Sequence, residues 1–150
     1  MLPTTHLDIL SPAPSELAVY LHHWQRDYSV ESSVPATRVA IEGAEKQLGP
    51  LPQPLRDLYL TTNGLWLNWF TIFPLEEPAR LKHTWDGLVR NNQKFNRAPA
   101  GFLAFATLGE GNLAYIRTGD ESLWFDDAEG LALTESGLVQ FIEACLKDAQ

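Results

Sequence analysis

Apolar residues follow the helical period near both ends of the chain. Between Pro12 and Tyr28 they recur at i, i+3, i+4, i+7 and i+11, and from Leu138 onwards at i, i+3, i+4, i+7 and i+8. Each spacing gathers apolar side chains on one face of a helix. We therefore predict an amphipathic helix at each end, the second capped by Ser136, with both apolar faces covering a core rather than a partner.

Two further helices are predicted around a proline-rich joint. Thr37 suits the cap of a helix over Arg38–Leu48, and Gly49, which tolerates a left-handed backbone, ends that helix before two prolines. Pro54 suits the first turn of a short helix, because the N–H that it lacks would have no partner there. The pair Asn63-Gly64 accepts positive φ angles and predicts the turn that follows.

A longer amphipathic helix is predicted over Pro78–Asn96. The pair Asn91-Asn92 has poor helix propensity, so we expect an end or a kink there. Its basic side is too small for non-specific binding of nucleic acid, and we interpret it as a solvated face. The apolar side consists of Leu81, Trp85, Leu88 and Phe95, and the basic side of Arg90, Lys94 and Arg97.

Strand patterns fill the middle and the C-terminal third of the chain. Leu65–Leu75 is rich in aromatic and β-favouring residues and predicts one or two strands at the centre of a sheet. We place Trp66 and Trp69 of this run in the core, because the run is apolar on both faces. The alternative is that they are exposed and anchor a protein partner. Four later runs separated by turn residues predict an antiparallel meander: Phe102–Phe105, Leu113–Arg117, Ser122–Phe125 and Leu131–Leu133.

The formal charge of −8 is concentrated in the last third of the chain. Residues 1–101 are nearly neutral, with 10 acidic and 9 basic side chains, whereas residues 102–150 hold 9 acidic and 2 basic ones. Such a field repels nucleic acid and steers basic protein surfaces towards it, although a solubilising face is an equally good interpretation. The predicted turns hold six of these acids: Glu110, Asp120, Glu121, Asp126, Asp127 and Glu129.

Length and composition limit the class of protein to which the chain can belong. A chain of 150 residues fits one domain, and no apolar run approaches the roughly 20 residues of a membrane span. The stretch Met1–Leu10 is too short and polar for a signal peptide, and the single Cys145 forms no internal disulfide. We expect a cytoplasmic protein without a membrane segment, with Cys145 as a buried, inert thiol.

Motifs for catalysis or ligand binding are absent from the sequence. There is no phosphate-binding loop, nucleophile elbow, HExxH motif or CxxC pair. His22 and His23 would point about 100° apart on a helix, and Asp126-Asp127 lacks the other ligands of a calcium loop. We therefore expect no enzyme, no cofactor and no metal, although catalytic residues from distant positions can converge in a fold.

A set of short motifs follows in a fixed order along the chain. In that order they are Ile41, Ala44, Glu45, Leu48-Gly49, Leu51-Pro52, Leu58-Tyr59, Asn63-Gly64, Ser136 and Phe141. Together these motifs resemble the SUKH superfamily, which contains the fungal cell-wall-synthesis regulator and many bacterial immunity proteins. The resemblance covers roughly residues 35–146, and the segment 65–100 contains no matching motif. We therefore predict a SUKH-like domain over residues 35–150, preceded by a helical extension over residues 1–34 that packs on the core.

The resemblance implies an α+β fold in a single domain. We expect a mixed or mainly antiparallel sheet of about six strands that ends in the meander, with helices packed against it at the N-terminus, in the middle and at the C-terminus.

Relatives of this kind imply a protein that binds another protein. The first hypothesis is an immunity protein, monomeric or weakly dimeric, that neutralises a toxin, commonly a nuclease. The alternative is a cytoplasmic scaffold with several partners, docking through the N-terminal helix or the aromatic run after Gly64. In the immunity hypothesis the six turn acids steer and pair with the toxin, and Trp66 or Trp69, if exposed, anchors it.

Overall fold

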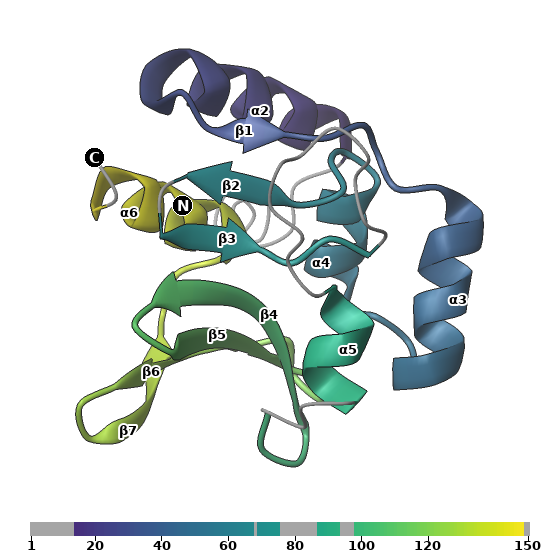
Figure 1. The fold of residues 1–150 in the computed structure, drawn as a ribbon, viewed down its shortest axis with the longest axis vertical. Helices are drawn as coiled ribbons and strands as arrows, with labels where there is room; N and C mark the ends of the chain where they lie inside the picture. Colours follow the sequence, from purple (N-terminus) through teal and green to yellow (C-terminus); the bar gives the residue numbers. More distant parts are fainter. Residues whose placement is uncertain (1–13, 68, 76–86, 94–97, 149–150) are drawn as a thin grey trace, which may run out of the picture.

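The computed structural model describes residues 14–67, 69–75, 87–93 and 98–148. They form the predicted α+β fold, with five helices and a seven-stranded sheet in the described part, against about six strands expected (Figure 1). The helices are α2 (Pro14–Tyr28), α3 (Arg38–Leu48), α4 (Gln53–Tyr59), α5 (Leu88–Gln93) and α6 (Leu138–Asp148). The strands are β1 (Glu31–Ser32), β2 (Leu65–Leu67), β3 (Phe70–Ile72), β4 (Phe102–Gly109), β5 (Asn112–Arg117), β6 (Leu123–Asp127) and β7 (Gly130–Thr134).

The sheet is antiparallel throughout, and its strands follow the order of the chain from β1 to β7. This order confirms the predicted C-terminal meander, which the strands β4 to β7 form. Tight turns make it possible: Glu110 and Gly111 between β4 and β5 both have positive φ angles, 53° and 82°. Two such residues match the right-handed twist of the strands that they join.

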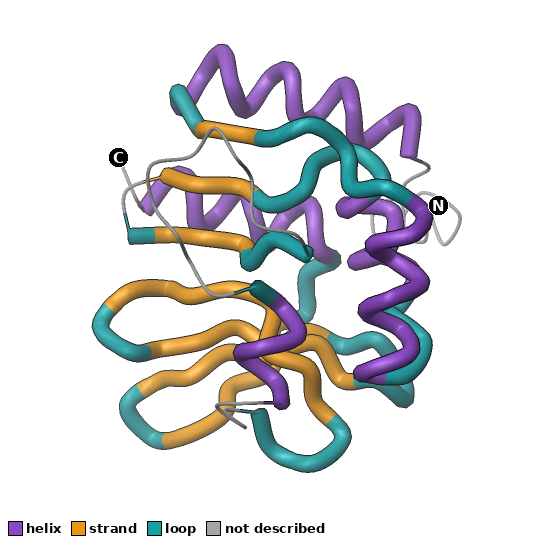
Figure 2. The backbone as a smooth tube through the Cα atoms, turned by 45° about the vertical axis from the view of Figure 1, so that its right-hand side comes forward, coloured by secondary structure: helices purple, strands orange, loops and turns teal. Residues whose placement is uncertain are grey.

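Helix α6 covers one face of the sheet. Its Phe141 lies edge-on to Phe105 of β4 and also meets Phe125 of β6, with ring centroids 6.2 and 6.5 Å apart. Helix α2 lies beside β1 and packs on α6, where the buried Trp24 donates a hydrogen bond of 3.1 Å to Glu143 (Figures 1 and 2). Helices α3 and α5 contact one another at one end of the sheet.

The end of the ladder between β3 and β4 is completed by a side chain. The last backbone bond of this ladder joins Phe73 N to Phe105 O at 2.9 Å. The next residue of β4, Ala104, is fully buried, and Asn92 of α5 meets both of its backbone groups. The Asn92 amide donates to Ala104 O and accepts from Ala104 N, each at 2.8 Å. Asn92 therefore replaces a strand residue at this point.

The predicted helix over Pro78–Asn96 is wrong as one continuous element. Most of its length lies outside the described residues, but Gly87 is not helical and α5 begins only at Leu88. Leu88 N donates to Pro74 O at 2.9 Å, and a Cβ on Gly87 would lie 2.8 Å from the same oxygen. The segment after β3 and the residue before α5 therefore approach too closely for a side chain at Gly87. The expected end near Asn91-Asn92 agrees with α5, which includes both asparagines and ends at Gln93, one residue further on.

Helix caps follow the predictions at α3 but not at α6. Thr37 accepts a hydrogen bond from Ala40 N at 3.0 Å, and Gly49 ends α3 with a φ of 89°. At α6 the Ser136 hydroxyl lies 2.8 Å from the Thr134 hydroxyl, and Gly137 O accepts the first helical bond from Phe141 N. The sequence could not show that Thr134 competes for Ser136.

We predict that Asn92→Ala lowers the free energy of unfolding by about 2–4 kcal/mol, because it leaves two buried backbone groups without partners. Urea unfolding at pH 7 measures this change. The control is Gln93→Ala on the exposed side of the same helix, which removes one solvent-exposed hydrogen bond to Gln47 O and should cost less than about 1 kcal/mol. Equal losses in the two variants would contradict this role of Asn92.

Candidate functional site

The six predicted turn acids are divided between opposite ends of the meander. Turns alternate between the two ends of an antiparallel sheet, so the β4–β5 and β6–β7 turns share one end and the β5–β6 turn lies at the other. Glu110 and Glu129 belong to the first end, together with Asp126 and Asp127 at the end of β6, whereas Asp120 and Glu121 belong to the other. The acids therefore form no single surface.

The two acids at the far end are occupied within the protein. Asp120 accepts hydrogen bonds from the Ser122 hydroxyl and backbone N–H at 2.7 and 3.1 Å, and these bonds lower the pKa of Asp120. Glu121, which has a positive φ of 60°, accepts from Gln53 N at 2.9 Å in the first turn of α4. These bonds join the meander to α4 and leave the two carboxylates less available to a partner.

Asp126 and Asp127 lie in β6 and not in the predicted turn, which consists of Ala128 and Glu129. The carboxylate of Asp126 is half-buried and accepts from Leu113 N at 2.9 Å and from the Tyr115 hydroxyl at 3.0 Å. Asp127 is exposed and accepts only locally, from Glu129 N at 2.8 Å. Asp126 thus fixes the position of the turn, and Asp127 remains accessible at its rim.

The two tryptophans of the aromatic run have different environments. Trp66 is 6% exposed and packs against Gly64, where a Cβ would lie 2.7 Å from its ring, in agreement with the core interpretation. Trp69 is 40% exposed in the β2–β3 turn. A Cβ on Gly109 would lie 3.2 Å from Trp69 Cβ, so Trp69 lies against the strand end beside Glu110. Only Trp69 is accessible to a partner.

One end of the sheet therefore combines an exposed indole with exposed carboxylates. Both overall views place the β2–β3, β4–β5 and β6–β7 turns on the same side of the molecule (Figures 1 and 2). The two meander turns are roughly 10 Å apart, two strand spacings. Within the described part of the chain none of the three exposed carboxylates forms an ion pair. We call this surface the acidic sheet end: Trp69, Glu110, Asp127 and Glu129.

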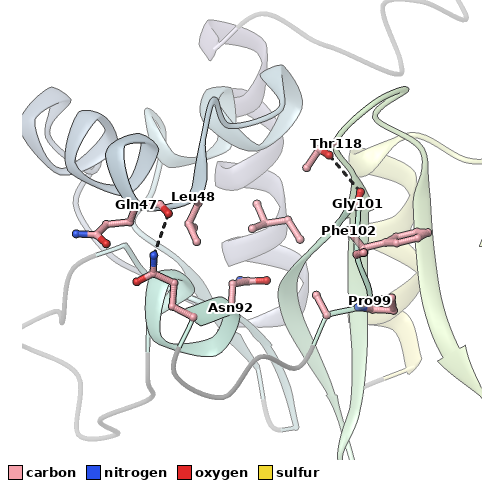
Figure 3. Close-up of a pocket in the computed structure, with 11 residues that line it drawn as sticks. Gln47, Leu48, Asn92, Pro99, Gly101, Phe102 and Thr118 are labelled. Atoms are coloured by element: carbon pink, nitrogen blue, oxygen red, sulfur yellow. Dashed lines mark hydrogen bonds between the residues drawn. The ribbon is translucent and has the colours of Figure 1, made fainter.

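A pocket of about 370 Å³ lies at a different place, between α3, α5 and the start of β4 (Figure 3). Among the described residues that line it, none has an ionisable side chain. Two of its polar groups are already bonded to neighbours, Gln93 Nε2 to Gln47 O at 2.9 Å and Thr118 Oγ1 to Gly101 O at 3.2 Å. The described part of the lining therefore holds no pair of acid and base.

The remaining candidates for chemistry in the described residues are a metal site, a membrane-spanning helix and the thiol of Cys145. They contain no group of three His, Cys, Asp or Glu side chains placed to hold a metal ion. None of the helices described is long and apolar enough to cross a membrane. Cys145 is buried on α6, and burial raises its pKa to about 12, so the side chain remains a thiol at neutral pH.

Asp57 of α4 is a buried residue outside the lining of this pocket. The Gln53 side chain donates to Asp57 Oδ1 at 2.6 Å. Burial raises the pKa of Asp57, and this hydrogen bond opposes the shift only in part. The charged form is therefore disfavoured in the folded protein relative to the unfolded chain.

Two exposed leucines belong to the accessible surface, and the sequence analysis does not identify them. Leu131 and Leu133 lie on β7 and are 38% and 51% exposed. The spacing Leu-Ala-Leu in the last strand of a meander was the available signal, since alternate residues share one face and a last strand has an edge.

We predict that Asp126→Ala lowers the free energy of unfolding by about 2–3 kcal/mol, since Leu113 N–H and the Tyr115 hydroxyl lose a charged acceptor. Asp127→Ala is the matched control and should cost less than about 1 kcal/mol, because its carboxylate is exposed. Urea unfolding compares them. A loss for Asp127→Ala as large as that for Asp126→Ala would contradict the assignment.

We predict that Asp57→Asn stabilises the protein at pH 7, because the amide keeps an acceptor for Gln53 and carries no buried charge. A carboxyl whose folded pKa is raised loses stability as pH rises through the acid range, so the variant's advantage should vanish below the ordinary aspartate pKa of about 3.9. The control Asp27→Asn should show the opposite sign, since Arg26 lowers the pKa of Asp27. Unfolding midpoints between pH 3 and 8 test both.

The comparison with known families matches most of the chain. Residues 35–144 match the SMI1 / KNR4 family (SUKH-1), a segment that begins just before α3 and ends within α6. No curated protein matches the chain. Domains of this family are generally non-catalytic immunity or regulatory proteins. The chain therefore belongs to the SMI1 / KNR4 family (SUKH-1), the superfamily that its motifs predicted.

Proposed function

We propose that this protein is a cytoplasmic, non-catalytic immunity protein that binds a cognate bacterial toxin through the acidic sheet end. The observation that carries the proposal is the exposed Trp69 next to Glu110, at the same end of the sheet as the exposed Asp127 and Glu129. Within the described residues none of these three carboxylates forms an ion pair. Family membership supports a protein that acts by binding a protein partner.

The charge of this surface suits a nuclease toxin. A nuclease presents cations to its phosphate substrate, and an anionic protein surface can occupy that site and exclude the substrate. Complementary charge mainly raises the rate of association, whereas an aromatic side chain in a desolvated contact supplies much of the affinity. The acidic turns would therefore steer the toxin, and Trp69 would anchor it.

Contacts within the protein hold the residues around the acidic sheet end in place, which supports a preorganised binding surface. The half-buried Asp126 ties the end of β6 to β5 through two hydrogen-bond donors. The close approach of Gly109 places Trp69 against the end of β4. A surface held by such contacts loses little conformational entropy when a partner binds.

The scaffold function with several partners receives less support. Its docking surfaces were the apolar face of the first helix and the aromatic run after Gly64. Leu17 and Trp24 of α2 are buried, and so are Trp66 and Phe70 of the aromatic run. We also propose that the chain divides into an extension over residues 1–34 and a domain over residues 35–150. In the described part of the extension, α2 contributes Trp24 to the hydrophobic core.

We predict that the triple variant Glu110→Lys, Asp127→Lys and Glu129→Lys weakens toxin binding about 100-fold or more, since like charges at an interface cost several kcal/mol. The tagged wild type first captures the toxin from its own cells, at moderate salt, with identification by mass spectrometry. The dissociation constants of wild type and variant are then measured by calorimetry.

The control variant carries the same change in charge elsewhere, at three exposed acids: Glu16→Lys, Glu42→Lys and Asp148→Lys. It should retain affinity within a few fold. Equal losses in both triple variants would show an effect of net charge alone and contradict this site. Capture of many cytoplasmic proteins without a toxin would contradict the immunity function and support the scaffold.

A further inference from the structure

Strand β7 forms the outer edge of the sheet. It is last in the strand order, and within the described part of the chain it pairs only with β6. The sequence Gly-Leu-Ala-Leu-Thr contains neither a charge nor a proline, the usual devices that protect an edge. β7 is therefore able to accept another strand.

The pairing with β6 shows which backbone groups of β7 are free. Ala128 and Glu129 form a two-residue loop, so the flanking pair Asp127 and Gly130 is the hydrogen-bonded type, and the types alternate along the hairpin. Leu131 and Leu133 fall in the non-hydrogen-bonded pairs. Their N–H and C=O groups consequently point away from β6, along the open edge.

The side chains of these two residues are apolar and exposed. Leu133 lies opposite Trp124 in the register, on the face away from Phe125 and α6. Trp124 in turn meets Phe102 edge-on, with ring centroids 5.6 Å apart. An apolar row thus extends from the free edge across the meander. Leu131 and Leu133 offer a strand both backbone partners and apolar contact.

The charges at the two ends of β7 indicate the kind of strand that fits. Glu129 precedes the strand and Glu135 follows it, and both are exposed. In an antiparallel pair of two copies with Leu131 opposite Leu133, Glu129 would lie opposite Glu135 at both ends. Like charges directly opposite one another are unfavourable, so self-pairing is opposed and basic flanks are favoured.

We propose that β7 binds an extended segment of the toxin as an eighth strand, one with alternating apolar residues flanked by Lys or Arg. Addition of a strand to a sheet edge gains affinity from backbone hydrogen bonds and specificity from alternate side chains. Glu129 belongs to both this edge and the acidic sheet end, so one partner can cover both. This inference rests on the proposed function for the identity of the partner.

The edge is tested directly with two synthetic peptides that share the core Val-Thr-Val-Thr-Val. One has two lysines at each end and the other two glutamates. Amide chemical shifts of the full chain are followed by NMR during titration to millimolar peptide. We expect the lysine peptide to shift the Leu131 and Leu133 amides and the glutamate peptide to bind at least 10-fold more weakly. No shift in β7, or equal binding of both peptides, would overturn the inference.

Two variants block the edge in different ways. Leu133→Pro removes an outward N–H without removing a bond to β6, and the double change Leu131→Lys with Leu133→Lys adds charge at the edge if the proline variant fails to fold. Val39→Lys on α3 is the control for an exposed apolar residue changed to lysine. Each blocking variant should weaken binding of the lysine peptide at least 10-fold, and the control variant should bind the peptide as the wild type does.

The same variants separate this inference from the proposed function. Toxin binding that survives the edge variants unchanged but is lost with the charge reversal at the acidic sheet end would overturn the inference alone. Failure to capture any toxin would overturn the proposed function, and with it the identity of the partner strand. A dimer in sedimentation equilibrium that Leu133→Pro dissociates would assign β7 to a second copy and overturn the inference.

Discussion

The fold depends on how buried backbone groups are satisfied where the ladder between β3 and β4 ends. A buried N–H or C=O without a partner costs about 1–3 kcal/mol, so the chain after β3 must supply partners from side chains. Asn92 supplies both bonds to Ala104, the Tyr59 hydroxyl donates to Phe73 O at 2.6 Å, and Asn63 Oδ1 accepts from Leu75 N at 2.7 Å. These contacts join α4 and α5 to the sheet and leave the meander to extend beyond it.

The meander divides its acids between support and recognition. Glu121 and Asp126 accept hydrogen bonds from backbone groups of other elements, and so they hold α4 and β5 in place. Asp127 and Glu129 make only a local contact and face solvent, beside the free edge of β7. Acidic residues with similar sequence surroundings thus have different roles. The role of each depends on which hydrogen-bond donors the fold places next to its carboxylate.

Local chemistry was enough to predict much of the fold. Thr37 and Gly49 set the ends of α3 because capping and positive φ angles depend on adjacent residues. The meander was predictable because alternating apolar runs with turn residues between them have few other arrangements. The long helix failed at Gly87, where a close approach to Pro74 decides the backbone, and Pro74 is distant in the sequence.

The sequence by itself determined the family, the α+β class, the ends of several elements and the excess of acids in the last third of the chain, because each depends on residue type and spacing. Only the tertiary structure decided which acids share an end of the sheet and that hydrogen bonds within the protein hold Asp126. It also decided that Trp69 is exposed while Trp66 is buried, and that Leu131 and Leu133 lie on the edge strand of the sheet. These properties depend on register and on contacts between distant residues, which a one-dimensional pattern does not specify.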